Sequence, residues 1–191
     1  RQINEFPSIN VKLDKNEVFR GMTDFTIQKP GSRNWLWELI AYKMFLSEGL
    51  IAPHAEYVEL IVNNNNFGLY LINDRLSKKF LERNNRRASI VIEIENKDPQ
   101  NDFELDGFPL FNSERIPFIR SMNFNSNGEF SELRSMALHK FKGYISGEYE
   151  IAEVFNLEQV AKLAAMKELL LSSEIQYDEI KWYFNPITEL F

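Results

Sequence analysis

Apolar and polar residues alternate along several short stretches of the chain, and a period of two is typical of strands. The longest stretch spans residues 57–72, where four Asn residues at 63–66 interrupt the pattern. Asn tolerates left-handed backbone angles, so we expect a hairpin with its turn at these four residues. Alternation also predicts strands at residues 9–13, 17–20, 24–29, 89–95 and 180–184, with a return strand starting at 189.

Four other stretches repeat apolar residues at intervals of three and four, which predicts amphipathic helices. They lie at residues 32–49, 75–84, 126–144 and 156–171. Asn156 precedes the last helix as an N-cap, and Asn73 or Asp74 is placed to cap the second. Residues 96–127 are rich in Asn, Asp, Pro and Ser and show little periodicity, so we expect a long irregular insertion there.

This order of elements predicts an α+β fold. An antiparallel sheet and two helices form an N-terminal part at residues 1–95, and a more helical part follows the insertion at residues 128–191. We expect a cleft between these two parts. A return strand that starts at Glu189 and stops at Phe191 leaves edge groups unpaired, so we expect the parent protein to continue past Phe191.

Composition narrows the class of protein. The 191 residues carry a net charge of −6, which disfavours a nucleic-acid-binding domain because phosphate contacts need a basic surface. The chain has no Cys, which excludes a thiolate nucleophile and disulfides. We find no apolar run of about 18 residues that would indicate a membrane-spanning helix. Composition leaves the compartment and the oligomeric state open.

Three groups of side chains offer chemistry. Lys29 continues an apolar strand face and is a candidate for holding an anion such as phosphate. Glu93, with Glu95, is a candidate for holding a metal or orienting a lysine. Glu174 and Asp178 lie in a polar loop, where they could serve as base and metal ligand. In each case the residue pattern alone favours an ordinary structural role.

Other polar residues carry weaker signals. We expect His54 and His139 to be structural or exposed. A basic group around residues 78–87 is expected to be a solvated helix face and turn rather than an anion site. The sequence has none of the common hydrolase, zinc-protease, P-loop or dinucleotide-binding motifs.

The ordered set of segments resembles the CotH kinase family of atypical kinase-like domains. The most specific part is YVELIVNNNNFGLYLINDRLSKKFLERNNRR at 57–87, in which Gly68, Tyr70 and Lys78 match the family pattern. The strand DFTIQKPGSRN at 24–34, the helix at 151–173 and IKWYFNPIT at 180–188 also resemble family segments. The resemblance covers most of the chain.

The resemblance implies an atypical protein-kinase-like fold and transfer of phosphate from ATP to serine on protein substrates, with a divalent metal, Mg or Mn. It makes Lys29 the phosphate-contacting lysine and puts Asp74 where the family has a glutamate that partners this lysine. Glu93 stands near a further family acid, which implies a nucleotide-binding role with Lys29 and Asp74. Glu174 and Asp178 fall near the catalytic loop, which implies catalytic roles. The metal-binding Asp segment would lie beyond Phe191.

Two alternatives stay open. The departures at Asn73, beside Asp74, and at Glu179, where the family often has Asn or His, also fit a catalytically inactive member that serves as a binding or coat-assembly module. The resemblance points to a spore coat, a cell envelope or another extracytoplasmic setting. An unrelated α+β domain with chance matches is the third interpretation.

Overall fold

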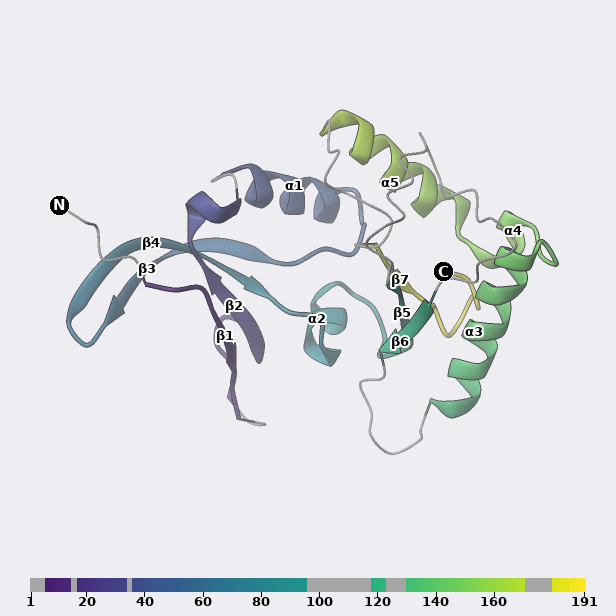
Figure 1. Ribbon diagram of the computed structural model, residues 1–191, viewed down its shortest axis with the longest axis horizontal. Helices are drawn as coiled ribbons and strands as arrows, with labels where there is room; N and C mark the ends of the chain where they lie inside the picture. Colours follow the sequence, from purple (N-terminus) through teal and green to yellow (C-terminus); the bar gives the residue numbers. More distant parts are fainter. Residues whose placement is uncertain (1–5, 15–16, 34–35, 96–117, 123–129, 171–179) are drawn as a thin grey trace. The chain divides into compact units, whose positions relative to one another are not determined.

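A computed structural model describes the chain except for residues 1–5, 15–16, 34–35, 96–117, 123–129 and 171–179. The chain divides into two compact units, Arg1–Arg86 and Arg87–Phe191. Figure 1 shows the elements of each unit. The strand predicted at 89–95, which the sequence grouped with the first sheet, belongs to the second unit.

The first unit is built on a four-stranded antiparallel sheet with the order β1-β2-β4-β3. Its strands are β1 (Ile9–Lys12), β2 (Asp24–Gln28), β3 (Ala55–Val62) and β4 (Asn65–Asp74). Its helices are the short 3-10 turn η1 (Pro30–Arg33), α1 (Leu36–Ser47) and α2 (Lys78–Arg83). The predicted hairpin is therefore confirmed as β3 and β4.

The turn of this hairpin consists of Asn63 and Asn64, whose φ angles are 52° and 65°. Positive φ at both central residues is the geometry of a type I′ turn, which matches the twist of the two strands it joins. Val62 and Asn65 face each other across the turn. The run of four Asn residues thus supplies the turn and also begins β4, which makes the turn shorter than the four residues predicted.

The two faces of the first sheet are covered differently: one carries a small apolar cluster, and α1 packs on the other. Phe25 and Ile72 lie on one face in a small apolar cluster with Met22. Tyr57 and Leu71 lie on the other face, on which α1 packs against β3. None of the residues of α1 is buried, so the helix covers this face without a continuous apolar core.

Two local predictions for the first unit are wrong. The strand predicted at residues 17–20 does not form: the neighbour of β1 is β2, and only an isolated bridge between Phe19 and Met22 forms in this segment. Arg20 and Gly21 adopt positive φ there, which ends any extended run. Neither Asn73 nor Asp74 caps α2, because β4 continues through both and Ser77 takes the cap, accepting from the N–H of Phe80 at 3.1 Å.

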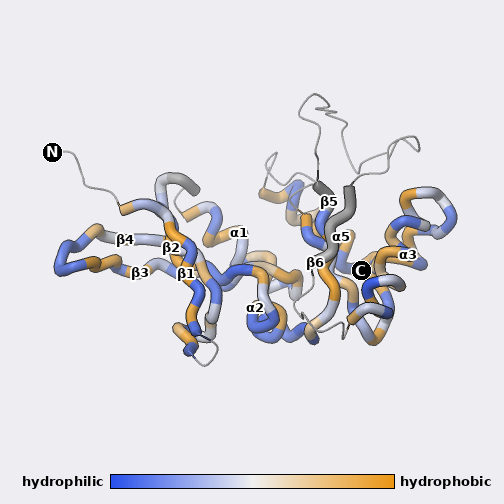
Figure 2. The backbone as a smooth tube through the Cα atoms, turned by 60° about the horizontal axis from the view of Figure 1, so that its bottom comes forward, coloured by the Kyte–Doolittle hydropathy of each residue, from blue (hydrophilic) through white to orange (hydrophobic). Residues whose placement is uncertain are grey.

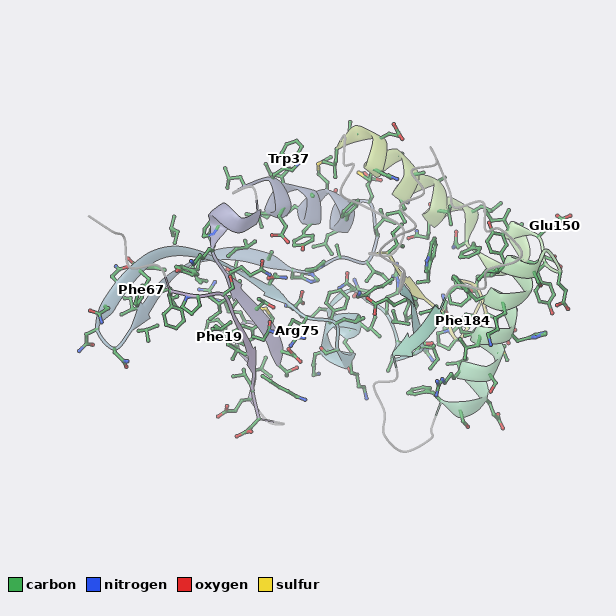
Figure 3. The ribbon with its side chains drawn as sticks, viewed as in Figure 1. Phe19, Trp37, Phe67, Arg75, Glu150 and Phe184 are labelled. Atoms are coloured by element: carbon green, nitrogen blue, oxygen red, sulfur yellow. The ribbon has the colours of Figure 1, made fainter. Side chains whose placement is uncertain are left out.

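The second unit contains a three-stranded antiparallel sheet with the order β6-β5-β7. Its strands are β5 (Val91–Glu95), β6 (Phe118–Met122) and β7 (Lys181–Tyr183), and its helices are α3 (Ser131–Ser146), α4 (Ile151–Val154) and α5 (Leu157–Leu169). The core is aromatic: Phe141, Phe155, Phe184 and Phe191 pack with the buried Ile90 and Ile92. Phe184 points into this core in Figure 3.

Sequence patterns predicted most helices and strands of the second unit but missed β6 and α4. Asn156 caps α5 as predicted, accepting from the N–H groups of Glu158 and Gln159. β6 lies inside the stretch that was expected to be irregular, and α4 was not predicted. Residues 189–191 form no return strand; instead the backbone of Phe191 bonds to Val154 and to Asn156.

The predicted α+β class is confirmed by the sheets and the helices of the two units. The likeness to a protein kinase stays a prediction. Among the helices in the described ranges, none has both the length and the apolar character required to span a bilayer.

Candidate functional site

Asp74 is the most deeply buried acidic group among the predicted site residues that the structure describes. It ends β4, and its side chain is only 2% exposed. One carboxylate oxygen accepts from the backbone N–H of His54 at 2.7 Å, and the other accepts from Arg83 Nη1 at 2.8 Å. The carboxylate is therefore fully engaged by the hairpin entry and by α2.

Burial and nearby charges shift the pKa values of two groups here, the Asp74 carboxyl and the His54 imidazole. Burial raises the pKa of the Asp74 carboxyl above its ordinary value, although the His54 N–H and the Arg83 charge act in the opposite direction. Burial and the positive charge of Arg83 lower the pKa of the His54 imidazole, and the nearby Asp74 offsets part of this. At neutral pH this environment favours a neutral His54 beside the ion pair.

His54 and Arg83 were not predicted to belong to a site. His54 Nδ1 lies 3.6 Å from Asp74 Oδ2, so this histidine is not isolated. Gly21 lies against Arg83: a Cβ at Gly21 would sit 3.3 Å from Arg83 Nε, and the φ of Gly21 is +82°. No spacing in the sequence connects residues 21, 54, 74 and 83, because the sheet and α2 bring them together from four separate segments.

Lys29 does not form the predicted pair with Asp74. It follows the end of β2, half-buried, and its backbone N–H donates to Ser8 Oγ at 3.4 Å. Asp74 faces Phe25 across β2 and β4. Lys29 lies four residues further along, which is roughly 13 Å at about 3.3 Å per residue. In the described structure, the cation that pairs with Asp74 is therefore Arg83.

Glu93 lies in the second unit, on β5, directly opposite Lys181 of β7. Its side chain is 18% exposed and its carboxylate accepts from Lys181 Nζ. Of the two chemical roles that the sequence left open, a metal ligand or a group that orients a lysine, the structure supports the second, and that lysine is Lys181. The side chain of Glu95 lies outside the described residues.

The predicted catalytic pair, Glu174 and Asp178, lies outside the described residues. Its roles therefore stay predictions. Within the described ranges, no group of three or more His, Asp or Glu side chains is placed to hold a metal ion.

A polar layer under α1 was missed by sequence analysis. Tyr42 OH donates to Glu38 Oε1 at 2.6 Å, and the buried Gln28 and Asn73 share a hydrogen bond of 3.0 Å on the same face of the sheet as Tyr57. Two shielded atoms of this layer, Glu38 Oε2 and Tyr57 OH, have no hydrogen-bond partner in the described structure. Burial and then the charge of Glu38 raise the pKa of the Tyr57 phenol.

The basic group around residues 78–87 is only partly the solvated face that the sequence pattern favoured: Lys79 is exposed, whereas Arg83 and Arg86 bond within the first unit. Arg83 pairs with Asp74, Lys79 pairs with Glu82 at 2.6 Å, and Arg86 donates to the carbonyl of Gly49 at 2.9 Å. His139 is exposed on α3 and contacts Tyr149 OH at 3.0 Å.

Comparison with known proteins identifies the family. A scan against protein-family models matches residues 4–183 to the family described as CotH kinase protein. A search of curated proteins finds no match. The family match covers nearly all of the 191 residues and includes both units. The chain belongs to the CotH kinase family.

Proposed function

We propose that this protein is a CotH-like phosphotransferase that moves the γ-phosphoryl group of ATP to serine on a protein substrate. The observation that carries the proposal is the family match from residue 4 to residue 183, because it spans both units rather than one short motif. A kinase needs groups that bind phosphate, position the acceptor and neutralise charge, and these come from separate segments of a chain.

Lys29 is the residue proposed to hold the phosphates of ATP. Lys29 is a partly buried lysine just past the end of β2, and its positive charge is suited to an anion such as phosphate. The cationic end of β2 thus fits the anionic half of a nucleotide. When bound, ATP supplies the phosphoryl group, and Lys29 orients its oxygens and offsets their charge.

The acids have proposed roles as well. We assign Glu174 as the base that accepts the proton of the serine hydroxyl, and Asp178 as a ligand for Mg or Mn. Asp74 would support the nucleotide site indirectly, by fixing Arg83 and the entry to β3. Glu93 would position Lys181. The described residues by themselves do not fit a metal ion, so no step is derived through one.

The experiment is a transfer assay with the full-length protein, radiolabelled ATP, Mg or Mn, and casein as a serine-rich acceptor. Lys29→Ala is expected to lower transfer by at least about 100-fold, because it removes a charge that acts on the reacting group. Lys12→Ala is the matched control, since Lys12 is an exposed lysine of the same sheet. Glu174→Gln is expected to lower the rate of transfer more than the affinity for ATP.

Each result has a clear meaning. Phosphoserine formed by the wild type and by Lys12→Ala but not by Lys29→Ala supports the proposal. Transfer by Lys29→Ala at the wild-type rate removes Lys29 from the mechanism. A wild type that transfers no phosphate with either metal overturns the phosphotransferase function.

A catalytically inactive binding or coat-assembly module is the second candidate. It is favoured by Asp74, whose short carboxylate is engaged by His54 and Arg83 instead of a lysine. Thermal unfolding separates the two functions, because a ligand at about 100 times its Kd adds roughly 2.7 kcal/mol of stability. No response to ATP with Mg or Mn favours the binding module.

A further inference from the structure

We propose that the outer edge of β3 is a docking site where an extended segment of a protein substrate joins the first sheet as an added strand. β3 is the last strand in the order β1-β2-β4-β3, so only β4 pairs with it in the described structure. It is eight residues long, Ala55–Val62, and contains no Pro. A free strand edge of this length is suited to pairing with another polypeptide.

The hydrogen-bond pattern identifies the groups that face outward. The backbone N–H of Asp74 donates to the carbonyl of His54 at 3.2 Å, which makes these two residues a hydrogen-bonded pair. Facing residues in an antiparallel ladder alternate between hydrogen-bonded and non-hydrogen-bonded pairs. The N–H and C=O groups of Ala55, Tyr57 and Glu59 therefore point away from β4. The register shifts between Leu60 and Ile61, and beyond it Val62 and Asn65 flank the two-residue turn as a hydrogen-bonded pair, so the N–H and C=O groups of Ile61 point outward as well.

These outward groups are open in the described part of the chain. No backbone hydrogen bond joins them to any other described segment. β2 pairs with β4 only at residues 71–74, near the open end of the hairpin. The rest of the hairpin extends beyond β2 (Figure 1). Within the described residues, this edge of β3 is therefore a row of alternating donors and acceptors with no strand paired to it.

Side chains beside the edge define the chemistry of the partner. Glu59 is exposed, as are the apolar side chains of Ile61 and Leu69, which are 59% and 62% accessible. All three lie on one face of the hairpin, because Glu59 faces Leu69 and Ile61 follows two residues later. Figure 2 shows hydrophobic positions on both strands next to the hydrophilic turn.

A strand with a basic residue and an apolar residue two positions apart fits this face. The basic residue would lie beside Glu59, and the apolar residue beside Ile61. Glu59 already accepts from Asn66 Nδ2 at 2.7 Å, which holds its carboxylate in place and leaves it exposed. The identification of the partner as a protein substrate rests on the proposed function, whereas the open edge does not.

The first test measures peptide binding without ATP or metal. The probe is a fluorescent peptide, Lys-Thr-Val-Thr-Lys-Thr-Val-Thr, and its counterpart carries Glu in place of Lys. We expect the Lys peptide to bind at least tenfold more tightly than the Glu peptide. Glu59→Pro removes one outward N–H but no bond to β4, so it is expected to weaken binding of both peptides at least tenfold.

Glu59→Ala is the matched control, because it removes the carboxylate and keeps the N–H. It is expected to retain binding and to lose the preference for Lys. Equal binding of the Lys peptide to the wild type and to a folded Glu59→Pro variant overturns the proposal. Circular dichroism checks that the Pro variant keeps its fold.

Hydrogen exchange of single amides gives a second test that needs no variant. In the free protein, the amides of Tyr57, Glu59 and Ile61 are expected to exchange at least tenfold faster than those of Val58 and Leu60. The Lys peptide is expected to slow the first set alone. Slow exchange of that set in the free protein means that the edge is already covered and overturns the proposal.

Two further outcomes separate the causes of failure. Protection that increases with protein concentration identifies a second copy on the edge and overturns the substrate assignment. If the peptide binds as expected but no phosphate is transferred, the edge stands and the proposed function fails. If phosphate is transferred but no peptide binds at β3, the proposed function stands and the docking site fails.

Discussion

Two carboxylates lie on opposite faces of the first sheet, and their hydrogen bonding differs. Both oxygens of Asp74 have donors, the backbone of His54 and the guanidinium of Arg83. Glu38 has one donor, Tyr42 OH, and its second oxygen has no hydrogen-bond partner in the described structure. One carboxylate is therefore held by two well-defined contacts, and the other by one.

The difference indicates which side of the sheet is structurally fixed. The Asp74 side is tied to the apolar cluster of Met22, Phe25 and Ile72, where Phe25 faces Asp74 directly. The Glu38 side is covered by α1, which buries none of its own residues and exposes Trp37 (Figure 3). We expect the Asp74 contacts to resist change and α1 to open at lower free energy, because few buried contacts hold it.

The largest expected effect comes from removing the partner of Asp74. Arg83→Met keeps much of the side-chain volume but leaves a buried carboxylate without its counterion, which typically costs about 3 kcal/mol. The free energy of unfolding in urea is the measurement. Lys79→Met is the matched control on the same helix, because its pair with Glu82 is exposed and is expected to contribute less than about 1 kcal/mol. Equal losses would mean that the Asp74 pair is no more important than a surface pair.

Tyr42→Phe tests the single donor of Glu38. The variant removes the 2.6 Å hydrogen bond and is expected to lower the free energy of unfolding by about 1 kcal/mol. Tyr149→Phe removes a hydroxyl that contacts the exposed His139 and serves as a control with a smaller expected effect. A loss for Tyr42→Phe as large as that for Arg83→Met would contradict the difference between the two faces.

Sequence patterns predicted the elements of this protein better than its contacts. The hairpin, α5 and its Asn156 cap follow from local signals, since turn residues, caps and apolar periods act over a few positions. β6 was missed because the surrounding residues 96–127 lack a clear period, although Phe118–Met122 pairs along its full length with β5.

The candidate site was harder to predict for a physical reason. The ion pair of Asp74 depends on the position of Arg83 at the end of α2, nine residues later in the chain, and on His54, which precedes β3 and faces Asp74 at the open end of the hairpin. Opposite charges at such spacings are common in sequences, so the pattern alone does not select this pair. Asp74 pairs with Arg83 rather than with Lys29 because the β2–β4 register places Phe25, not Lys29, opposite Asp74. The alternation of apolar and polar residues in the sequence does not determine this register.

The pH dependence of stability sharpens the description of the Asp74 side. The pKa of His54 is lowered in the folded state. As the pH falls, the unfolded chain therefore binds a proton at His54 at a higher pH than the folded chain does. The contribution of His54 to stability is lost as pH falls below about 6.5. The raised pKa of Asp74 acts in the opposite direction, because the folded state then binds a proton more readily. His54→Gln should therefore lose less stability than the wild type between pH 7.5 and 5.5 in urea titrations. An identical slope for both proteins would show that His54 does not titrate differently on folding.

The smallest effect is expected for Tyr57→Phe, and its sign is the informative part. Removing a buried hydroxyl normally destabilises a protein when the hydroxyl is hydrogen-bonded, but Tyr57 OH is shielded and has no hydrogen-bond partner in the described structure. The variant also removes a group whose pKa is raised by burial and by the charge of Glu38. We expect the free energy of unfolding to stay within about 0.5 kcal/mol of the wild type or to rise. A loss of unfolding free energy near that of Tyr42→Phe would show that Tyr57 OH has a hydrogen-bond partner in solution, for example a buried water. The polar layer under α1 would then be as well hydrogen-bonded as the Asp74 side.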